Sequence, residues 1–563
     1  MARNLLSLFI FSLLASAACT GAAPETAPLQ PEDSKQSGSE ATLAVPAEEA
    51  RPSGNGSEGG KLGGKLVRLF IDPPTLDPHI TTDATSAQII VELFGGLLTI
   101  DPDLNIAPDL AERWDISPDG TVYTFHIRKD AVFHDGRPVT AEDFRWSFER
   151  ATSPLTESPV VDQYLGDIKG VTEKVNGDAS AISGVKVIDD HTLEITIDAP
   201  KAYFLAKMTY PTAFVLDRHN VEANPRDWFR APNGTGPFKL DRYDVGESLF
   251  LTRHQDYHLG PPHLAEVEFI LSGGTAMLMY ENEEIHLAGV GLADLDRLLD
   301  PTNPLNQELL RAPPSFSIQY IGLNVNEPPL DDPKVRQALN LAVDKHEIAT
   351  IVLGDQVVPA KGILPPGFPG YDPGLKGYEF DHDRARQLLK ESKYGDDLEN
   401  IPPIIMTGSG SFGASVSLDM EVMLQMWEKN LGLQVEFQRT EFATFLRDLH
   451  QRRFQMFDIG WIADYPDPEN FLDILFYSES GNNHTNYNSP VVDSLLEEAR
   501  TETDQTRRYQ LYNQAERIIL EDAPWVPLWY SGERYLLLKP YVKDYYQTPL
   551  IIPKLRYVYL TDQ

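Results

Sequence analysis

Alternating apolar and polar residues predict two β-strands in the first half of the chain, one on each side of a helix. Residues 123–128 read Tyr-Thr-Phe-His-Ile-Arg and residues 193–197 read Leu-Glu-Ile-Thr-Ile, so every second side chain is apolar. Between them, Thr140-Ala-Glu-Asp143 has the pattern of a capping box, and positions 144, 147, 148 and 151 form one apolar helical face. We therefore expect a helix that begins after Thr140.

Helical spacing becomes more frequent from residue 330. Asp332-Pro333 is typical of a helix start, and an apolar stripe with helical spacing follows over 335–343. A second helix is expected from Asp344 to its stop at Gly354.

The remainder of the chain predicts a βαβ-like unit followed by two strands. The unit comprises a strand over 403–407, a helix over about 414–430 and a strand over 433–438, which implies parallel pairing. The closing strands are expected over 526–530 and 534–538. This order indicates a chain that leaves one lobe, builds a second lobe and returns to the first.

The first 18 residues have the pattern of an export signal. Arg3 precedes an apolar run over 5–14, and small residues lead to Cys19, the single cysteine. About ten apolar residues are too few to cross a bilayer core, which needs about 20. Cys19 resembles the lipidated cysteine of a bacterial lipobox, although Ser16 stands where leucine is usual. We expect removal of residues 1–18 and a lipid on Cys19; plain cleavage beside an incidental cysteine is the alternative.

Residues 19–61 are expected to form a disordered tether between this anchor and the folded body. Residues 20–60 are rich in Ala, Pro, Ser, Gly and Glu and contain no aromatic residue, so they cannot bury enough apolar surface to fold. No later stretch reaches 18 consecutive apolar residues, so we expect no membrane span in the mature protein.

Charge excludes one class of partner. The 563 residues include 84 acidic and 48 basic side chains, a formal net charge of −36. Nucleic-acid binding depends on clustered Lys and Arg, so no nucleic-acid partner is expected. The acidic excess is consistent with a solvated surface or with an acidic cleft for cationic ligands.

A long series of motifs runs through the chain. The early motifs are Ala107–Trp114, Ser117–Gly120, Tyr123–Arg128, Phe133–Gly136, Pro138–Asp143 and Ser147–Arg150. The later motifs are Gly234-Thr-Gly-Pro-Phe238, Asn324 through Ala338, Gly460–Pro468, Asn486-Tyr487 and Val492-Asp493. Spread over some 400 residues, these motifs resemble the family 5 extracytoplasmic solute-binding proteins of ABC importers, of the oligopeptide- and dipeptide-binding type.

The resemblance implies an α/β fold of two lobes joined by hinge strands, the type II periplasmic-binding-protein architecture of the large cluster with an extra subdomain. Lobe 1 is then expected to comprise residues 62–105, 230–325 and the C-terminal return 525–563. The extra subdomain spans 106–229 and lobe 2 spans 326–524.

The resemblance also implies a binding receptor without catalysis, cofactor or metal. It captures short peptides outside the cell, in an interlobe cleft, and delivers them to the membrane subunits of an importer; we expect a monomer on the periplasmic or cell-surface side. Peptide-binding members hold the ligand's ammonium with the Asp of a Trp-x-x-Asp segment, here Asp464 after Trp461. Tyr465 and Asn486 are the further candidate ligand contacts, and a loop or helix-capping role for Asp464 is the alternative.

Two departures leave the ligand open. Some oligopeptide-binding members carry a basic residue shortly before Gly-Trp, but residues 457–460 read Phe-Asp-Ile-Gly, and Gly95 stands where many members have Glu. No group is therefore identified for a peptide carboxylate. A nickel complex, an oligosaccharide or another solute remains an alternative ligand, and an extracellular hydrolase or chaperone is an alternative function.

Other motifs have weaker contexts. Gly408–Gly413 fits the G-x-G-x-x-G dinucleotide pattern, but an exported protein has no supply of NAD. His254, His258 and His263 lie in a Gly- and Pro-rich segment, and His134 sits beside a turn, so structural or solvated roles are expected for all four.

Overall fold

The computed structural model describes residues 63–395, 401–410 and 416–562. The expected export signal, the lipidated Cys19 and the tether lie outside the described residues, as does part of the glycine-rich motif over 408–413. No helix in the described ranges combines the length and apolar character needed to cross a membrane.

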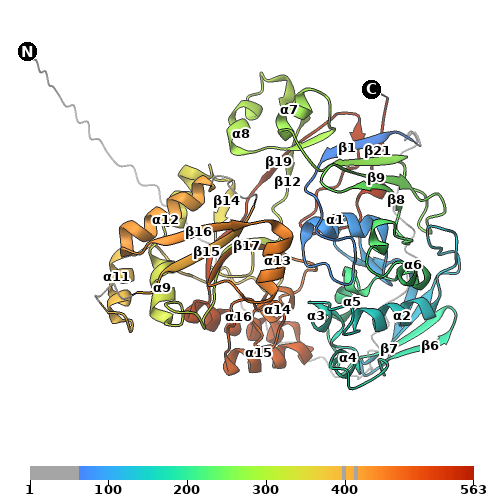
Figure 1. Ribbon diagram of the computed structural model, residues 1–563, viewed down its shortest axis with the longest axis horizontal. Helices are drawn as coiled ribbons and strands as arrows, with labels where there is room; N and C mark the ends of the chain where they lie inside the picture. The colour runs from blue at the N-terminus through green and yellow to red at the C-terminus, as the bar shows by residue number, and fades with distance from the viewer. Residues whose placement is uncertain (1–62, 396–400, 411–415, 563) are drawn as a thin grey trace, which may run out of the picture. The chain divides into compact units, whose positions relative to one another are not determined.

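A seven-stranded sheet organises the first lobe (Figure 1). The central strand β1 pairs in parallel with β10 and β11, and the other pairings are antiparallel. In sheet order the strands are β12 (Leu309–Ala312), β19 (Arg534–Leu538), β11 (Leu287–Gly289), β1 (Lys65–Leu69), β10 (Glu266–Ile270), β9 (Ser248–Arg253) and β8 (Phe238–Asp244).

Helix α1 (Ala84–Leu93) packs on this sheet through its buried residues Ile89, Ile90 and Leu93. Asp83 caps it by accepting a hydrogen bond from the backbone of Ser86 at 2.7 Å. The remaining elements of this lobe are α7 (Ala276–Glu281), α8 (Leu292–Leu299), η3 (Pro304–Glu308), β20 (Val542–Lys543), η6 (Leu555–Tyr557) and β21 (Tyr559–Leu560).

A four-stranded antiparallel sheet forms the extra subdomain. Its order is β4 (Ala111–Ile116), β5 (Val122–Ile127), β7 (Thr192–Thr196) and β6 (Val185–Asp189), which confirms both predicted strands. Helix α2 (Ala141–Ala151) confirms the predicted start, since the backbone of Thr140 donates to Asp143 Oδ2 at 2.8 Å. The short elements around it are β2 (Leu98–Ile100), β3 (Ile106–Pro108), α3 (Val161–Leu165), α4 (Val171–Val175), α5 (Phe204–Lys207), η1 (Pro211–Ala213), α6 (Arg218–Ala223) and η2 (Trp228–Arg230).

A six-stranded mixed sheet organises the second lobe. Its order is β14 (Val357–Pro359), β18 (Trp525–Ser531), β13 (Ser317–Leu323), β17 (Met456–Ile462), β15 (Ile404–Ser409) and β16 (Val435–Thr440). Strands β15 and β16 pair in parallel on either side of α12 (Leu418–Leu431), which confirms the predicted βαβ unit.

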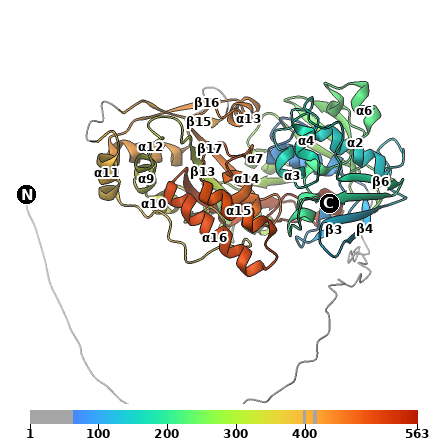
Figure 2. The same cartoon turned by 90° about the horizontal axis from the view of Figure 1, so that it is seen from below.

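Eight further helical segments belong to the second lobe of the described chain. Figure 2 shows α15 and α16 lying side by side. The segments are α9 (Pro333–Leu341), α10 (Lys345–Glu347), η4 (Ile348–Val352), α11 (His382–Glu391), α13 (Phe442–His450), α14 (Glu469–Phe476), α15 (Pro490–Thr501) and α16 (Gln505–Asp522), with a turn at 365–368.

The chain passes between the two large sheets over residues 313–316 and 532–533. The boundaries expected after 325 and after 524 differ from these crossings by several residues. The physical reason is strand pairing: β13 pairs with β17 from Ser317↔Ile462 to Leu323↔Met456, and β18 pairs with β13. Both strands therefore lie in the second sheet.

Candidate functional site

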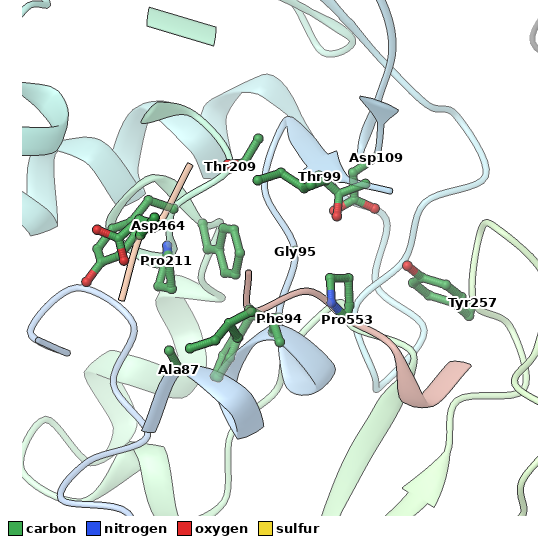
Figure 3. A pocket seen from close by; sticks show the side chains of 16 residues that line it. Ala87, Phe94, Gly95, Thr99, Asp109, Thr209, Pro211, Tyr257, Asp464 and Pro553 are labelled. Carbon is green, nitrogen blue, oxygen red and sulfur yellow. The ribbon is translucent and has the colours of Figure 1, made fainter. Parts of the chain in front are cut away.

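A small cavity lies where Asp464 follows β17. Its walls come from the end of α1, from the segments around Asp109, Tyr210 and Tyr257, and from Ala463 and Asp464 of the second lobe. Figure 3 shows Asp464 and Asp109 reaching the cavity from different sides, with Gly95 between them. The volume of about 40 Å³ is enough for one or two water molecules and is too small for a peptide.

Asp464 is held by hydrogen bonds from both lobes. Its Oδ2 accepts from Tyr164 Oη of α3 at 2.5 Å and from Asn470 Nδ2 of α14 at 2.9 Å. The backbone N–H of Asp464 donates to Asn470 Oδ1 at 2.9 Å, which fixes the loop before α14. Desolvation by the surrounding protein raises the pKa of this carboxyl to about 6.

The hydroxyl that meets Asp464 belongs to a stacked pair of tyrosines. The rings of Tyr164 and Tyr210 lie 3.6 Å apart and 4° from parallel. Tyr210 lines the cavity, and Tyr164 stacks on it and reaches Asp464 with its hydroxyl. Sequence reasoning missed Tyr164 and Asn470, because neither has a local signal that relates it to Asp464.

The other three predicted ligand contacts lie outside the cavity lining. Trp461 is half-buried and its Nε1 donates to Asn470 Oδ1 at 3.3 Å, so it supports Asp464 through Asn470. Tyr465 is fully buried and its hydroxyl donates to Glu469 at 2.5 Å. Asn486 donates to Asn324 Oδ1 at 3.0 Å, which ties its loop to the end of β13.

Buried ion pairs join α5 of the subdomain to α14 of the second lobe. Lys207 Nζ lies 2.8 Å from Glu469 Oε1 and 3.1 Å from Asp167 Oδ2. Burial disfavours the charge on Lys207, but these two carboxylates raise its pKa above its ordinary value. Burial raises the pKa of Glu469 to about 7, although Lys207 opposes the shift. The network ties the extra subdomain to the second lobe.

Strand β17 has an edge that its neighbours leave partly unpaired. On one side it pairs with β13 along its whole length, from Met456 to Ile462. On the other side, β15 pairs only with residues 456–458. From Ile459 onward, this edge meets no strand of the described ranges, and it runs directly toward Asp464.

The two departures from the family pattern have structural counterparts. Asp458 accepts a hydrogen bond from Gln319 Nε2 at 2.6 Å, and burial raises its pKa to about 6. A Cβ at Gly95 would lie 2.6 Å from Asp109 Oδ2, so the side chain of Asp109 occupies the space that a larger residue would need.

The candidate metal-binding side chains have other partners. His134 bonds through its two ring nitrogens with the backbones of Gly234 and Gly236. His254 Nδ1 bonds with the carbonyl of Gly236, and His258 Nε2 lies 2.8 Å from Asp109 Oδ1. In the described part of the chain, no three His, Cys, Asp or Glu side chains are arranged to hold a metal ion.

Comparison with known proteins identifies the family. Residues 105–483 match the model of the bacterial extracellular solute-binding proteins, family 5. The chain is 32% identical to the periplasmic oligopeptide-binding protein OppA of Escherichia coli over 84% of this chain and 87% of that protein. It is 33% identical to the probable deoxycholate-binding periplasmic protein YgiS of Escherichia coli, over 87% and 91% of the two chains.

A solved structure supports the same assignment. The Escherichia coli murein tripeptide-binding protein MppA superposes with a TM-score of 0.80 at 27% identity, over 90% of this chain and 99% of that chain. The chain therefore belongs to the family 5 bacterial extracellular solute-binding proteins.

Proposed function

We propose that this protein captures short peptides between its two lobes and delivers them to the membrane subunits of an ABC importer. Membership of the family makes it a solute-binding protein and not an enzyme. The observation that carries the peptide assignment is Asp464, whose carboxylate lines the interlobe cavity and whose bonding partners in the described chain are neutral.

A peptide ammonium is the ligand group that suits this carboxylate. Keeping the ionised carboxylate of Asp464 away from water beside neutral donors costs free energy, as its raised pKa indicates. A cation bound to the carboxylate offsets this cost. Tyr164 and Asn470 hold the carboxylate in place, so its orientation is set before the ligand binds.

The edge of β17 can bind the peptide main chain. An extended ligand pairs with free backbone N–H and C=O groups, and this gives affinity without selecting side chains. Because the edge leads from Ile459 to Asp464, a peptide paired there would place its amino end at the carboxylate.

Peptide entry requires the lobes to separate, because the cavity has a volume of only about 40 Å³. We propose the two crossings over 313–316 and 532–533 as the hinges, with the lobe boundaries set there. Closure is then a population shift driven by a ligand that contacts both lobes.

A bile acid is the alternative ligand, because the relative YgiS is described as probably binding deoxycholate. Deoxycholate carries a carboxylate, which Asp464 and Asp109 of the cavity would repel. The negative charge of the lining therefore favours a ligand that carries an ammonium group.

The relatives are extracytoplasmic binding proteins, and this chain acts outside the cytoplasm as they do. We propose that a lipid on Cys19 retains the mature protein at the membrane. The mass of the mature amino-terminal fragment tests this proposal, since a diacylglycerol adds a defined mass and plain cleavage adds none.

Native mass spectrometry of the gently purified protein tests the peptide assignment. The expected result is retained ligands with the masses of short peptides, depleted in Asp464→Asn and kept in the control Glu436→Gln, a change at an exposed acid of β16. A bile acid, a sugar or a metal complex in the absence of peptide would refute the assignment.

A further inference from the structure

A second cavity lies beside the points where the chain crosses between the lobes. It has a volume of about 110 Å³, room for a small carboxylate with a few waters. Ser315 of the first crossing lines it, as do Arg534, which directly follows the second crossing, and Ile462 at the end of β17. It shares Ile551 with the cavity of Asp464, so the two sites adjoin through the segment 549–555.

Three cationic side chains face this space, in a chain whose net charge is −36. They are Arg68 of β1, Arg534 of β19 and Lys554. Within the described residues, none of the three lies in an ion pair. Arg534 donates to the carbonyls of Pro313 at 3.0 Å and Thr548 at 3.2 Å, which are neutral acceptors.

Arg68 has a buried hydrogen-bond donor that lacks an acceptor within the described ranges. Its Nη1 donates to Tyr545 Oη at 3.2 Å, and its guanidinium lies over the ring of Phe70. Its Nε is buried and has no acceptor among the described atoms. A buried guanidinium N–H without an acceptor is costly, and an anion in the cavity would satisfy it.

The acid in the lining, Glu92, offsets these cations only in part at neutral pH. Its Oε1 accepts from the backbone of Leu555 at 2.9 Å, while the buried Oε2 has no described partner. Burial raises its pKa to about 7, so near neutrality a large fraction is protonated and can donate to an anion.

We propose that this cavity binds a carboxylate-sized anion, held by Arg68, Arg534 and Lys554. The anion has two sources: the carboxylate end of a bound ligand or a free small anion from solution. The first source rests on the proposed function: Asp464 would bind the ligand's ammonium and this cavity would bind its carboxylate, so that the protein selects a zwitterion. The second source does not depend on the proposed function.

The test compares the wild type with Lys554→Gln, Lys554→Arg and the double change Arg68→Gln with Lys554→Gln. Lys543→Gln, at an exposed lysine of β20, is the matched control. Each protein is incubated with random peptides of two to five residues, either with free carboxylates or C-terminally amidated, and bound peptide is quantified by native mass spectrometry. Acetate-dependent shifts in melting temperature are recorded in parallel, and circular dichroism verifies folding.

The outcomes separate the two sources. If the ligand supplies the carboxylate, the wild type binds peptides with a free carboxylate at least tenfold better than amidated peptides, and Lys554→Arg and Lys543→Gln keep this preference. The preference falls several-fold in Lys554→Gln and disappears in the double variant. If a free anion binds, acetate raises the melting temperature of the wild type and not that of the double variant, whatever the peptides do. If acetate stabilises the wild type in this way but no peptide binds to it, the proposed function is refuted while the anion site is supported. The inference would be overturned if neither amidation of the peptides nor addition of acetate affected the folded wild type differently from the folded variants.

Discussion

The carboxylate of Asp464 accepts hydrogen bonds from Tyr164 and Asn470 and meets no described cation. Neutral donors orient a carboxylate without neutralising it, so a bound ammonium gains both a charge partner and a fixed geometry. At the scale of single residues, the peptide proposal depends on this one charge.

Removing that charge weakens binding. Asp464→Asn keeps the shape of the side chain and leaves the ligand ammonium without its partner, so we expect a loss of about 2–5 kcal/mol in binding free energy. Calorimetry with a peptide recovered from the wild type measures it, and Glu436→Gln serves as the control. Equal affinities for the wild type and Asp464→Asn would show that Asp464 does not hold the ligand.

The same carboxyl predicts a pH profile for binding. Its pKa of about 6 in this ligand-free arrangement of the lobes means that, below pH 6, binding must displace a proton, so affinity falls by up to about tenfold per pH unit. Above about pH 8 a peptide amino group loses its proton in solution, and affinity falls again. Titration by calorimetry should give this bell shape for the wild type and no acidic limb for Asp464→Asn. An acidic limb that persists in the variant would assign the titration to another group.

The family resemblance makes Asp464 a candidate because Trp461 and the Asp form the short Trp-x-x-Asp motif. It does not identify Tyr164, which lies 300 positions earlier, or Asn470, whose role depends on the turn between β17 and α14. It includes Tyr465, although that side chain turns away from the cavity to bond with Glu469. Contacts made by folding between distant segments leave no periodic pattern.

At the scale of elements, α5 and α14 meet through Lys207 and Glu469, while β17 has an edge that no described strand pairs with from Ile459 onward. The predicted strands and the βαβ unit are confirmed because alternation and helical spacing are local properties. The pairing of α5 with α14 was not predicted, because Lys207 and Glu469 lie in separate stretches without a shared motif.

Breaking that ion pair should favour the open arrangement of the lobes. Lys207→Met leaves Glu469 buried without its cation, and opening restores water to it, so we expect peptide affinity to fall by about 2 kcal/mol or more. Small-angle scattering should give a larger radius of gyration for the ligand-free variant than for the wild type, and Lys207→Arg should restore the wild-type value. Identical radii and affinities for Lys207→Met and the wild type would exclude a role in closure.

At the scale of the whole molecule, two crossings separate a seven-stranded sheet from a six-stranded one. The sequence order predicts two lobes with a C-terminal return, and β19, near the C-terminus, lies in the same sheet as β1. The expected boundaries place β13 and β18 in the first lobe, because an apolar strand carries no mark of the sheet that it joins; that choice is made by its pairing with β17.

Closure of the lobes should be visible in the fluorescence of Trp461. Its indole bonds to Asn470, which also holds Asp464, so a bound ammonium changes its surroundings. We expect a saturable emission change on peptide addition that disappears in Trp461→Phe while calorimetric binding remains. Trp427, buried in the core of the second lobe, should contribute no change. A full signal in Trp461→Phe would contradict this placement.

The most direct measurement is the affinity of the wild type for one recovered peptide and for the same peptide acetylated at its amino end, both by calorimetry near pH 7. Acetylation removes the positive charge and leaves the main chain and side chains unchanged. We predict that the acetylated peptide binds at least a hundredfold more weakly, and that Asp464→Asn narrows the difference. Equal affinity of the wild type for both peptides would contradict an interlobe site in which Asp464 holds the ligand ammonium.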